Sequence, residues 1–439
     1  MKICMIGTGY VGLVSGTCFA DLGNNVICVD KNENIIKKLN QGKSTIYEPG
    51  LNELIKKNFS SQRLKFTTNM REAIKKSKLI FICVGTPTKK NSQEVDLRYV
   101  FTSLREIIKN INSKKIIIMK STVPVGTSDM IEKILKKKRK KYVEVISNPE
   151  FLREGEAVRD FRFPDRIVIG SNNPKFFSVM KKLYQPLISK GAKFFTTRRL
   201  GAELIKYASN SFLATKITFI NELANLCEKS NINIEDIALG MGSDSRIGSR
   251  FLRAGPAYGG SCFPKDTKGL VSAAERYKIN LSVVKSVIKS NQDRFNLLTK
   301  RIHKILGSNL KNKRISFLGV TFKPNTDDMR DSSSLKMIPY LTKKGAIVTY
   351  YDPSGEKKIF KKIKNCFYKK DIKSNCFSSD LIILLTEWDE FKSINFKSIV
   401  KNKKFKVYDL RNLYNTEDMK KNKIKYYSVG RPDINLFQK

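Results

Sequence analysis

The sequence is almost without histidine, the side chain that proteins use most often as a general acid or base. The one histidine, His303, lies in the amphipathic segment Arg301–Leu306, where a helix surface is its expected place. Proton transfer by a His–Asp pair is therefore not expected. The eight cysteines include no C-x-x-C pair, so the usual zinc ligands are not clustered and we predict no metal site.

Acidic side chains are also scarce relative to basic ones. The chain has 40 Asp and Glu against 84 Lys and Arg, a formal charge of +44. Such an excess can indicate a nucleic-acid or membrane partner. Here, however, the lysines are spread along the whole chain, and the densest basic run, residues 136–141, follows a predicted helix. This distribution is typical of a general compositional bias, so we predict neither a nucleic-acid nor a membrane partner.

Long apolar spans and a signal peptide are missing as well, because Met1 leads directly into the short apolar segment Lys2–Ile6. Among the scattered cysteines, Cys4, Cys28 and Cys83 fall in apolar, strand-like runs and are predicted to be small core residues. Free thiols indicate a reducing compartment. We therefore expect a cytoplasmic protein, and its 439 residues suffice for two or three domains.

A glycine-rich turn near the start carries the first functional signal. The predicted strand Lys2–Ile6 runs into G-T-G-Y-V-G at residues 7–12, which is followed by apolar residues at helical spacing. A second strand, Val26–Val29, ends at Asp30. This arrangement is the fingerprint of dinucleotide binding, in which the glycines bring the backbone against a pyrophosphate. Asp30 would bind the ribose hydroxyls and repel a 2′-phosphate, so NAD is predicted rather than NADP.

A second glycine-rich turn, residues 256–266, contains a cysteine among charged residues. In its sequence P-A-Y-G-G-S-C-F-P-K-D, Lys265 follows Cys262 by three residues and Asp266 follows it by four. A neighbouring ammonium favours the thiolate, which is the nucleophilic form. The alternative is an inert packing cysteine. Beside a nicotinamide site, a nucleophilic cysteine indicates oxidation at the aldehyde level, in which a thiohemiacetal loses hydride and water cleaves the resulting thioester.

Further motifs are spread along the chain. They are Y-E-P-G-L (47–51), V-G-T-P (84–87), S-T-V-P-V-G-T (121–127), N-P-E-F-L-R-E-G (148–155) and T-F-K-P (321–324). Together with the two turns, and in this order, they resemble the UDP-glucose/GDP-mannose dehydrogenase family over nearly the whole chain. Within that family, the motifs at 148–155 and 258–262 look more like the UDP-glucose branch.

The resemblance implies an α/β protein with two Rossmann-like, doubly wound domains joined by a helical central domain. The implied borders are an NAD-binding domain at 1–196, a central dimerisation domain at 197–300 and a UDP-sugar-binding domain at 301–439. The residues agree, because short apolar runs separated by helical stretches predict a mainly parallel sheet in the last part. These runs are Arg314–Leu318, Ile347–Tyr351, Leu381–Leu385 and Lys406–Tyr408.

The resemblance also implies roles for a central group of catalytic residues. Cys262 would attack the C6 aldehyde that the first oxidation forms. Lys206 would stabilise the oxyanion of the alkoxide or thiohemiacetal, and Asn210 would orient the same oxygen or a water. Lys206 and Asn210 are four residues apart and would share one face of a helix, although such a pair by itself is usually only a polar surface.

Three more residues complete the implied catalytic set. Asp266 would belong to a water and proton network with Lys206, and Thr122 would lie beside the reacting centre. Glu150 would activate water for thioester hydrolysis, although by itself it could be an ordinary loop acid. A carboxylate of ordinary pKa is a weak base, so we expect burial to raise the pKa of Glu150.

The remaining implied residues bind the ligands. Those for NAD are Gly7, Gly9, Tyr10, Val11, Gly12, Asp30, Thr86, Thr122, Glu154, Lys265 and Arg330. Those for the nucleotide sugar are Glu150, Phe151, Leu152, Glu154, Lys206, Asn210, Arg246, Phe251, Leu252, Arg253, Ala254, Gly255, Tyr258, Gly259 and Lys323. The chain departs from the family at Ile35, where many members have a lysine five residues after the strand-ending acid.

The leading hypothesis is therefore a homodimeric enzyme that oxidises UDP-glucose to UDP-glucuronate with two NAD. Arg246 resembles an arginine that crosses from a neighbouring subunit, and it could equally be a surface residue. The nearest alternative is a sister enzyme acting on GDP-mannose or a UDP-N-acetylhexosamine. An alternative of another class is a basic dinucleotide-binding protein without catalysis, against which the joint presence of Cys262, Lys206, Asn210 and Asp266 argues.

Overall fold

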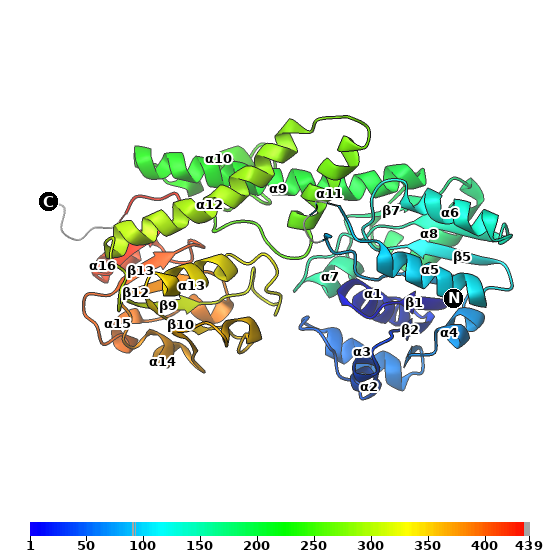
Figure 1. Ribbon diagram of the computed structural model, residues 1–439, viewed down its shortest axis with the longest axis horizontal. Helices are drawn as coiled ribbons and strands as arrows, with labels where there is room; N and C mark the ends of the chain where they lie inside the picture. The colour runs from blue at the N-terminus through cyan, green and yellow to red at the C-terminus, as the bar shows by residue number, and fades with distance from the viewer. Residues whose placement is uncertain (90–91, 93, 434–439) are drawn as a thin grey trace. The chain divides into compact units, whose positions relative to one another are not determined.

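The computed structural model describes residues 1–89, 92 and 94–433, and the chain divides into two compact units. Unit 1 comprises Met1–Ser209 and Lys268–Asn280, and unit 2 comprises Asn210–Thr267 and Leu281–Lys439. Helices α9 (Arg199–Ser230) and α11 (Phe263–Glu275) each contribute residues to both units (Figure 1). The predicted domain borders at 196 and 300 therefore stay a prediction.

Unit 1 contains an eight-stranded sheet in the order β3-β2-β1-β4-β5-β6-β7-β8. Neighbouring strands are parallel except β6 and β7, which meet antiparallel at Ser147 and Gly170. The order 3-2-1-4-5-6 is that of a dinucleotide-binding Rossmann sheet. The strands are β1 (Lys2–Ile6), β2 (Asn25–Val29), β3 (Leu64–Thr67), β4 (Leu79–Ile82), β5 (Lys115–Met119), β6 (Val143–Ser147), β7 (Arg166–Gly170) and β8 (Lys193–Thr197).

Helices cover both faces of this sheet because successive strand residues point to opposite sides. In β1, Ile3 and Met5 join one apolar cluster, which includes residues of α1, α2, α3, α7 and α8, whereas Cys4 and Ile6 join another, which includes residues of α4, α5 and α6. The helices are α1 (Tyr10–Asp21), α2 (Glu33–Asn40), α3 (Leu51–Ser60), α4 (Met70–Lys76), α5 (Arg98–Asn110), α6 (Thr127–Lys137), α7 (Ala157–Arg162), η1 (Pro174–Phe176) and α8 (Phe177–Ile188).

Unit 2 contains a six-stranded, fully parallel sheet in the order β11-β10-β9-β12-β13-β14, which repeats the order of the first six strands of unit 1. The strands are β9 (Arg314–Leu318), β10 (Ile347–Tyr351), β11 (Cys366–Tyr368), β12 (Leu381–Leu384), β13 (Lys406–Asp409) and β14 (Lys425–Ser428). The helices are α10 (Ile234–Gly242), α12 (Ser282–Leu306), α13 (Ser334–Lys343), η2 (Lys358–Phe360), α14 (Ile372–Cys376), η3 (Asp389–Phe391), α15 (Phe396–Ile399) and α16 (Thr416–Lys421).

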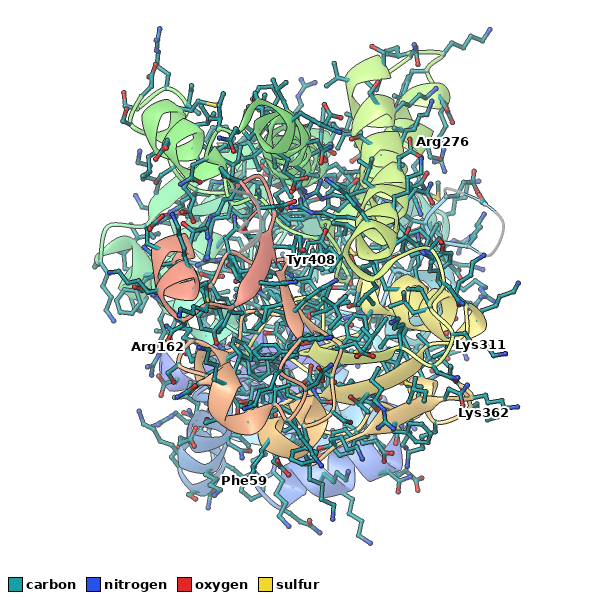
Figure 2. All side chains as sticks on the ribbon, turned by 90° about the vertical axis from the view of Figure 1, so that its left-hand side faces the viewer. Phe59, Arg162, Arg276, Lys311, Lys362 and Tyr408 are labelled. Carbon is teal, nitrogen blue, oxygen red and sulfur yellow. The ribbon has the colours of Figure 1, made fainter. Side chains whose placement is uncertain are left out.

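The predicted fold class is confirmed, and the predicted strands occur within a residue or two of their expected bounds. His303 lies on α12 as expected, but it is half-buried, with Nε2 3.0 Å from the Tyr340 hydroxyl. Most of the basic run 136–141 is exposed, and basic side chains such as Lys311 and Lys362 extend outward while Tyr408 is buried (Figure 2). None of the helices in the described ranges is long and apolar enough to cross a lipid bilayer.

Candidate active site

The glycine turn of unit 1 has the geometry that a dinucleotide requires. Gly7 has φ +97°, and a Cβ there would lie 2.7 Å from the Cys83 carbonyl oxygen. A Cβ on Gly12 would collide with the Gly7 carbonyl, so this glycine lets α1 pack closely on β1. A Cβ on Gly9 would meet nothing within 4 Å, and no side chain caps α1 at this position. The open backbone at the N-terminus of α1 fits a pyrophosphate.

Asp30 follows β2 at the edge of this turn. Its Oδ2 accepts hydrogen bonds from the Thr8 amide and hydroxyl, both at 2.9 Å, and its Oδ1 accepts from the Asn32 amide at 3.0 Å. These bonds fix the carboxylate while leaving lone pairs for ribose hydroxyls. Ile35, at the position where the family often has a lysine, packs against the apolar core.

A buried carboxylate that the sequence motifs only hinted at joins the glycine turn to the 148–155 segment. Glu48, from the Y-E-P-G-L motif, accepts hydrogen bonds from Tyr10 Oη and from the amides of Gly155 and Ala157, the latter two at 2.7 Å. The acid thereby caps α7. Tyr10, predicted to contact NAD, thus has its hydroxyl engaged by the protein, while Glu154 is buried next to this cap.

Thr86 and Thr122, which were both predicted to contact NAD, lie side by side: Thr86 Oγ1 donates to the Thr122 carbonyl at 2.9 Å. Thr122 also lines a small pocket in unit 1 with Met119, Ser121, Val123, Ser147, Pro149, Glu203 and Lys206.

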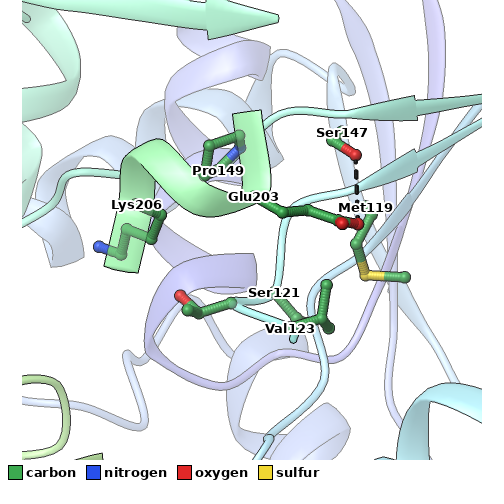
Figure 3. A pocket seen from close by; sticks show the side chains of 8 residues that line it. Met119, Ser121, Val123, Ser147, Pro149, Glu203 and Lys206 are labelled. Carbon is green, nitrogen blue, oxygen red and sulfur yellow. Dashed lines mark hydrogen bonds between the residues drawn. The ribbon is translucent and has the colours of Figure 1, made fainter. Parts of the chain in front are cut away.

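In Figure 3 the Glu203 carboxylate points toward Ser147, whereas Lys206 points away from it. Glu203 accepts from the Gly126 and Ser128 amides at 2.7 and 2.9 Å and so caps α6. Glu203 lies three residues before Lys206, so the two share one face of a helix, and this spacing was the one sequence signal that could have identified Glu203.

Glu150 and Lys206 form the central ion pair of unit 1. Lys206 Nζ lies 3.0 Å from Glu150 Oε1, and both side chains are at most 5% exposed. Glu150 Oε2 accepts from the Leu152 amide at 2.6 Å. Burial by itself would raise the pKa of Glu150, but the Lys206 charge and the Leu152 hydrogen bond outweigh it, and the pKa lies below its ordinary value. The predicted rise in pKa is therefore wrong, because the neighbouring ammonium stabilises the ionised form more than burial disfavours it.

The Phe151 ring, predicted to contact the sugar, lies between two cations. The Arg166 guanidinium carbon is 4.0 Å and Lys206 Nζ is 5.2 Å from its centroid. Arg166 was not predicted, and its position at the start of β7 gave no signal. Its stacking fixes the ring next to the Glu150–Lys206 pair.

In unit 2, Cys262 immediately precedes α11, and its carbonyl accepts the first helical hydrogen bond from the Asp266 amide at 2.8 Å. The thiol is half-buried, with Ser261 Oγ 3.4 Å from Sγ. The positive end of a helix favours a thiolate at this place. The role of Cys262 as a nucleophile rather than a packing residue stays a prediction, whereas Cys4, Cys28 and Cys83 are buried as predicted.

Asp266, on the first turn of α11, is fully buried and gathers two other predicted residues. Asn210 Nδ2 donates to its Oδ2 at 2.6 Å, and Lys265 Nζ pairs with its Oδ1. Along α9, Asn210 follows Lys206 by one turn, and both are buried, so the predicted shared helix position is confirmed. Among the described residues, no group of His, Cys, Asp or Glu side chains has the arrangement of a metal site.

The glycines of the cysteine loop allow close packing within unit 2. A Cβ on Gly259 would lie 2.4 Å from the Asp331 carbonyl oxygen, and Gly260 has φ +79° with its amide donating to the Arg330 carbonyl at 2.8 Å. Tyr258 is buried, and Asn291 bonds both its amide and its carbonyl. The loop is thus held against the segment that contains Arg330.

The predicted sugar-binding loop 251–255 is also anchored inside unit 2. Phe251 has φ +67°, Leu252 and Ala254 are buried, and the Gly255 amide donates to Asn221 Oδ1 at 2.8 Å. An unpredicted arginine, Arg411, lies two residues after β13 and close to Gly255.

Arg411 also reaches the T-F-K-P motif, because its Nη2 donates to the Phe322 carbonyl at 2.8 Å. Lys323 Nζ lies 5.8 Å from the Phe322 ring centroid. Ligands of such folds bind at the carboxyl ends of the parallel strands, and Arg411 lies just past one of these ends. This position was the sequence signal that could have identified Arg411 as a site residue.

Three predicted arginines, Arg246, Arg253 and Arg330, have exposed side chains. Arg246 forms an ion pair with Asp244 at 2.6 Å, and Arg330 forms one with Asp328 at 2.8 Å. In each case the partner lies only two residues away in the sequence. Arg253 is exposed. Their predicted ligand contacts stay predictions.

Comparison with known proteins gives matches along most of the chain. Family models of the UDP-glucose/GDP-mannose dehydrogenase family match residues 1–188 (NAD binding domain), 201–293 (central domain) and 316–416 (UDP binding domain). A UDP-glucose 6-dehydrogenase of Rhizobium meliloti is 45% identical over 99% of this chain and 100% of its own length. One of Rickettsia felis is 46% identical over 98% and 96%.

Solved structures of nucleotide-sugar dehydrogenases also match nearly the whole chain. A UDP-glucose dehydrogenase from Pyrobaculum islandicum has a TM-score of 0.89 at 33% identity and covers 98% of this chain and 97% of its own. A UDP-D-ManNAc dehydrogenase from Pyrococcus horikoshii has a TM-score of 0.86 at 25% identity, with 99% and 100% covered.

Proposed function

Because this chain belongs to the UDP-glucose/GDP-mannose dehydrogenase family, we propose that it oxidises UDP-glucose to UDP-glucuronate in two NAD-dependent steps. Family membership confirms the predicted NAD cofactor and the class of NAD-dependent oxidoreductase. The proposal adds the sugar and the double oxidation. The observation that carries the double oxidation is the half-buried Cys262 thiol at the start of α11, in a glycine-rich loop.

In the first oxidation, the C6 hydroxyl of the sugar loses its proton and C6 loses a hydride, which gives an aldehyde. NAD, held by the open backbone between Gly7 and Gly12, supplies the hydride acceptor in each oxidation. Lys206 stabilises the alkoxide, because its ammonium is fixed by Glu150 and need not reorganise as charge develops.

In the second oxidation, the Cys262 thiolate bonds to the aldehyde carbon, and Lys206 and Asn210 stabilise the oxyanion of the thiohemiacetal. Loss of a second hydride leaves a thioester. A water then attacks the carbonyl carbon and the C–S bond breaks, which releases the carboxylate and restores the thiolate. Glu150 is ionised at neutral pH because its pKa is lowered, and it orients this water through a hydrogen bond. In total, UDP-glucose, two NAD⁺ and one water give UDP-glucuronate, two NADH and three protons.

The relatives bear on the choice of sugar. The UDP-glucose 6-dehydrogenases of Rhizobium meliloti and Rickettsia felis share almost half of their residues with this chain, whereas the UDP-D-ManNAc dehydrogenase shares a quarter. This favours UDP-glucose over GDP-mannose or a UDP-N-acetylhexosamine. The buried Glu150–Lys206 and Asn210–Asp266 pairs argue against a protein that only binds NAD, because a passive binder has no need for buried charges.

We further propose a cytoplasmic homodimer. No disulfide joins any of the described cysteines, which suits a reducing compartment. On α9, Phe212, Phe219 and Leu226 are 66%, 48% and 62% exposed and follow one another at seven-residue spacing. Such an apolar stripe on a helix is suited to pairing with a second copy. Arg246 would then reach the partner's sugar site.

The test is the yield of NADH per nucleotide sugar. We expect two NADH per UDP-glucose consumed, with little free aldehyde, because Cys262 holds the intermediate covalently. UDP-GlcNAc, UDP-ManNAc and GDP-mannose should give markedly lower kcat/KM. One NADH per UDP-glucose with aldehyde in solution would contradict the double oxidation, and faster turnover of another sugar would contradict the substrate.

A further inference from the structure

Lys120 is a buried lysine for which the reaction above has no use. It follows β5 directly, precedes the S-T-V-P motif and is 4% exposed. Its Nζ lies 3.2 Å from Asn148 Oδ1 and 3.4 Å from the Tyr184 hydroxyl. Both partners are uncharged, so the ammonium is solvated by dipoles rather than neutralised by a carboxylate. A buried cation in such surroundings costs stability and calls for a functional reason.

The partner Asn148 begins the segment that carries Glu150. Its Oδ1 accepts from Tyr184 Oη at 2.6 Å as well as from Lys120, and its Nδ2 donates to the Val168 carbonyl at 3.0 Å. Its amide donates to the Met119 carbonyl at 2.8 Å. Asn148 is thereby fixed to β5, β7 and α8 at once, two residues before Glu150.

Lys120 also acts on Glu150 through space. The positive charge of Lys120 contributes, after that of Lys206, to holding the pKa of Glu150 down, and Glu150 in turn favours the charged form of Lys120. The carboxylate is therefore influenced by two ammonium groups, of which only Lys206 is in direct contact.

We propose that Lys120 is a positioning residue for Glu150: through Asn148 it holds the loop that carries the carboxylate, and its ammonium adds to the positive charge of Lys206 in favouring the ionised carboxylate. The proposal rests on the function assigned to Glu150 above.

The surroundings of Lys120 leave few groups that change charge near neutral pH. The groups that face it from the neighbouring elements are Cys83 after β4, Asn148 and Glu150 after β6, Tyr184 on α8 and Lys206 on α9. Burial raises the pKa of the Cys83 thiol to about 12 and raises that of Tyr184 as well, so both stay neutral. Burial lowers the pKa of Lys120 to about 8, so its charge is present at neutral pH and is lost at moderately alkaline pH.

The chain offers a matched control in Lys115, at the opposite end of β5. Lys115 is also buried, and its Nζ donates to the carbonyls of Lys75 and Ser77 at 3.0 and 2.6 Å. Burial lowers its pKa too. It therefore matches Lys120 in burial and in uncharged hydrogen-bond partners, and those partners are not among the site residues named above.

The experiment measures the titration of Glu150 itself. Full-length protein is labelled with ¹³C-glutamate, and its infrared carboxylate bands are compared with those of Glu150→Gln to isolate the Glu150 signal. In Lys120→Met the pKa of Glu150 should rise by roughly 0.5–1 unit, because a neighbouring positive charge is removed. Lys120→Arg, which keeps the charge, and Lys115→Met should leave the pKa unchanged. Lys120→Gln serves the same purpose if the methionine variant does not fold.

Activity and stability give two further readouts. The acid limb of kcat against pH should shift upward in Lys120→Met by the same amount as the infrared titration. The thermal midpoint of Lys120→Met should be equal or higher, because an apolar side chain replaces a buried charge. An unchanged titration of Glu150, with or without a loss of thermal stability, overturns the proposal. If the parent protein forms no NADH from UDP-glucose, the proposed function fails, while the infrared titration still decides the role of Lys120.

Discussion

At the scale of the residue, environment rather than type separates the proposed functional side chains from the others. Cys262 is half-buried at a helix start, whereas Cys4, Cys28 and Cys83 are buried in or beside strands, where burial raises the pKa of each thiol. In Glu150 a neighbouring charge outweighs burial. Burial alone would raise the pKa of this carboxyl group, but Lys206 lowers it. The same chemical group is thus active or inert according to the charges and dipoles around it.

The residue-scale prediction concerns Cys262. Cys262→Ala should abolish formation of UDP-glucuronate, by roughly a thousandfold or more in kcat, because no thioester can form without the sulfur. Slow exchange between alcohol and aldehyde should survive, since the first oxidation needs Lys206 but no thiol.

In Cys262→Ser, an ester should accumulate because esters hydrolyse more slowly than thioesters. The intact-protein mass after incubation with UDP-glucose and NAD measures this adduct. Near-normal acid production by Cys262→Ala would return Cys262 to a structural role.

At the scale of the element, single acids join helices that are distant in sequence. Asp21, at the end of α1, bonds Lys57 of α3 at 2.8 Å and Arg162 of α7 at 2.6 Å. Glu48 and Glu203 cap α7 and α6 in the same way, from other parts of the chain. These acids hold the loops around the glycine turn and the Glu150–Lys206 pair in unit 1.

The element-scale prediction is a pH dependence of stability from Asp21. Burial alone would raise the pKa of Asp21, but the hydrogen bonds from Lys57, Arg162 and Asn58 lower it to about 2. The folded-state pKa is therefore below the unfolded value of about 3.9, so the stabilisation is complete above that value and is lost as the pH falls toward about 2.

Asp21→Asn should lower the free energy of unfolding by about 1 kcal/mol at neutral pH, after allowance for solvent screening. The difference from the parent should shrink as the pH falls through about 4 to about 2. Urea unfolding across this range measures it. Asp389→Asn is the control, because the Asp389–Lys392 pair is exposed and should contribute almost nothing. A difference that does not change with pH would show that Asp21 stabilises by packing alone.

At the scale of the whole molecule, the sheet of unit 2 repeats the order of the first six strands of unit 1, but the two units match different ligand-binding domains. Gly319 repeats the role of Gly7, with φ +75° and its amide bonded to Tyr351 as that of Gly7 is to Val29. Asp352 repeats Asp30 by accepting from the Val320 amide, but it is fully buried and bonded to Ser354 as well. Being closed to solvent, it cannot accept hydrogen bonds from a dinucleotide ribose as Asp30 would. Unit 1 matches an NAD binding domain and unit 2 a UDP binding domain.

The whole-molecule prediction concerns assembly. Phe219→Glu places a charge in the apolar stripe of α9 and should weaken the homodimer by roughly tenfold or more in Kd, because a charge in an apolar interface stays unpaired. Phe367→Glu on β11 is the matched control, since Phe367 is as exposed as Phe219 and lies outside the stripe. Sedimentation velocity over a range of concentrations measures both. Equal dissociation of the two variants, or a monomeric parent, would contradict the proposed dimer.

The sequence by itself determined the local features of this protein. The strand β1, the glycine turn and Asp30 lie within 30 residues, and the Cys262 loop lies within 11, so short-range conformational preferences and spacing suffice to predict them. The strands of the second sheet were predictable for the same reason, because each is a short run of apolar or β-branched residues.

Only the tertiary structure decided which side chains meet. Glu150 and Lys206, like Asn210 and Asp266, are 56 residues apart, and no local pattern indicates that their polar atoms touch. Lys120 had no sequence signal as a site residue, and the Y-E-P-G-L motif only hinted at Glu48, because the roles of both depend on burial and on partners from other elements. The pKa of Glu150 was predicted in the wrong direction for the same reason: burial can be guessed from sequence, but the position of a compensating charge is fixed only when the chain packs.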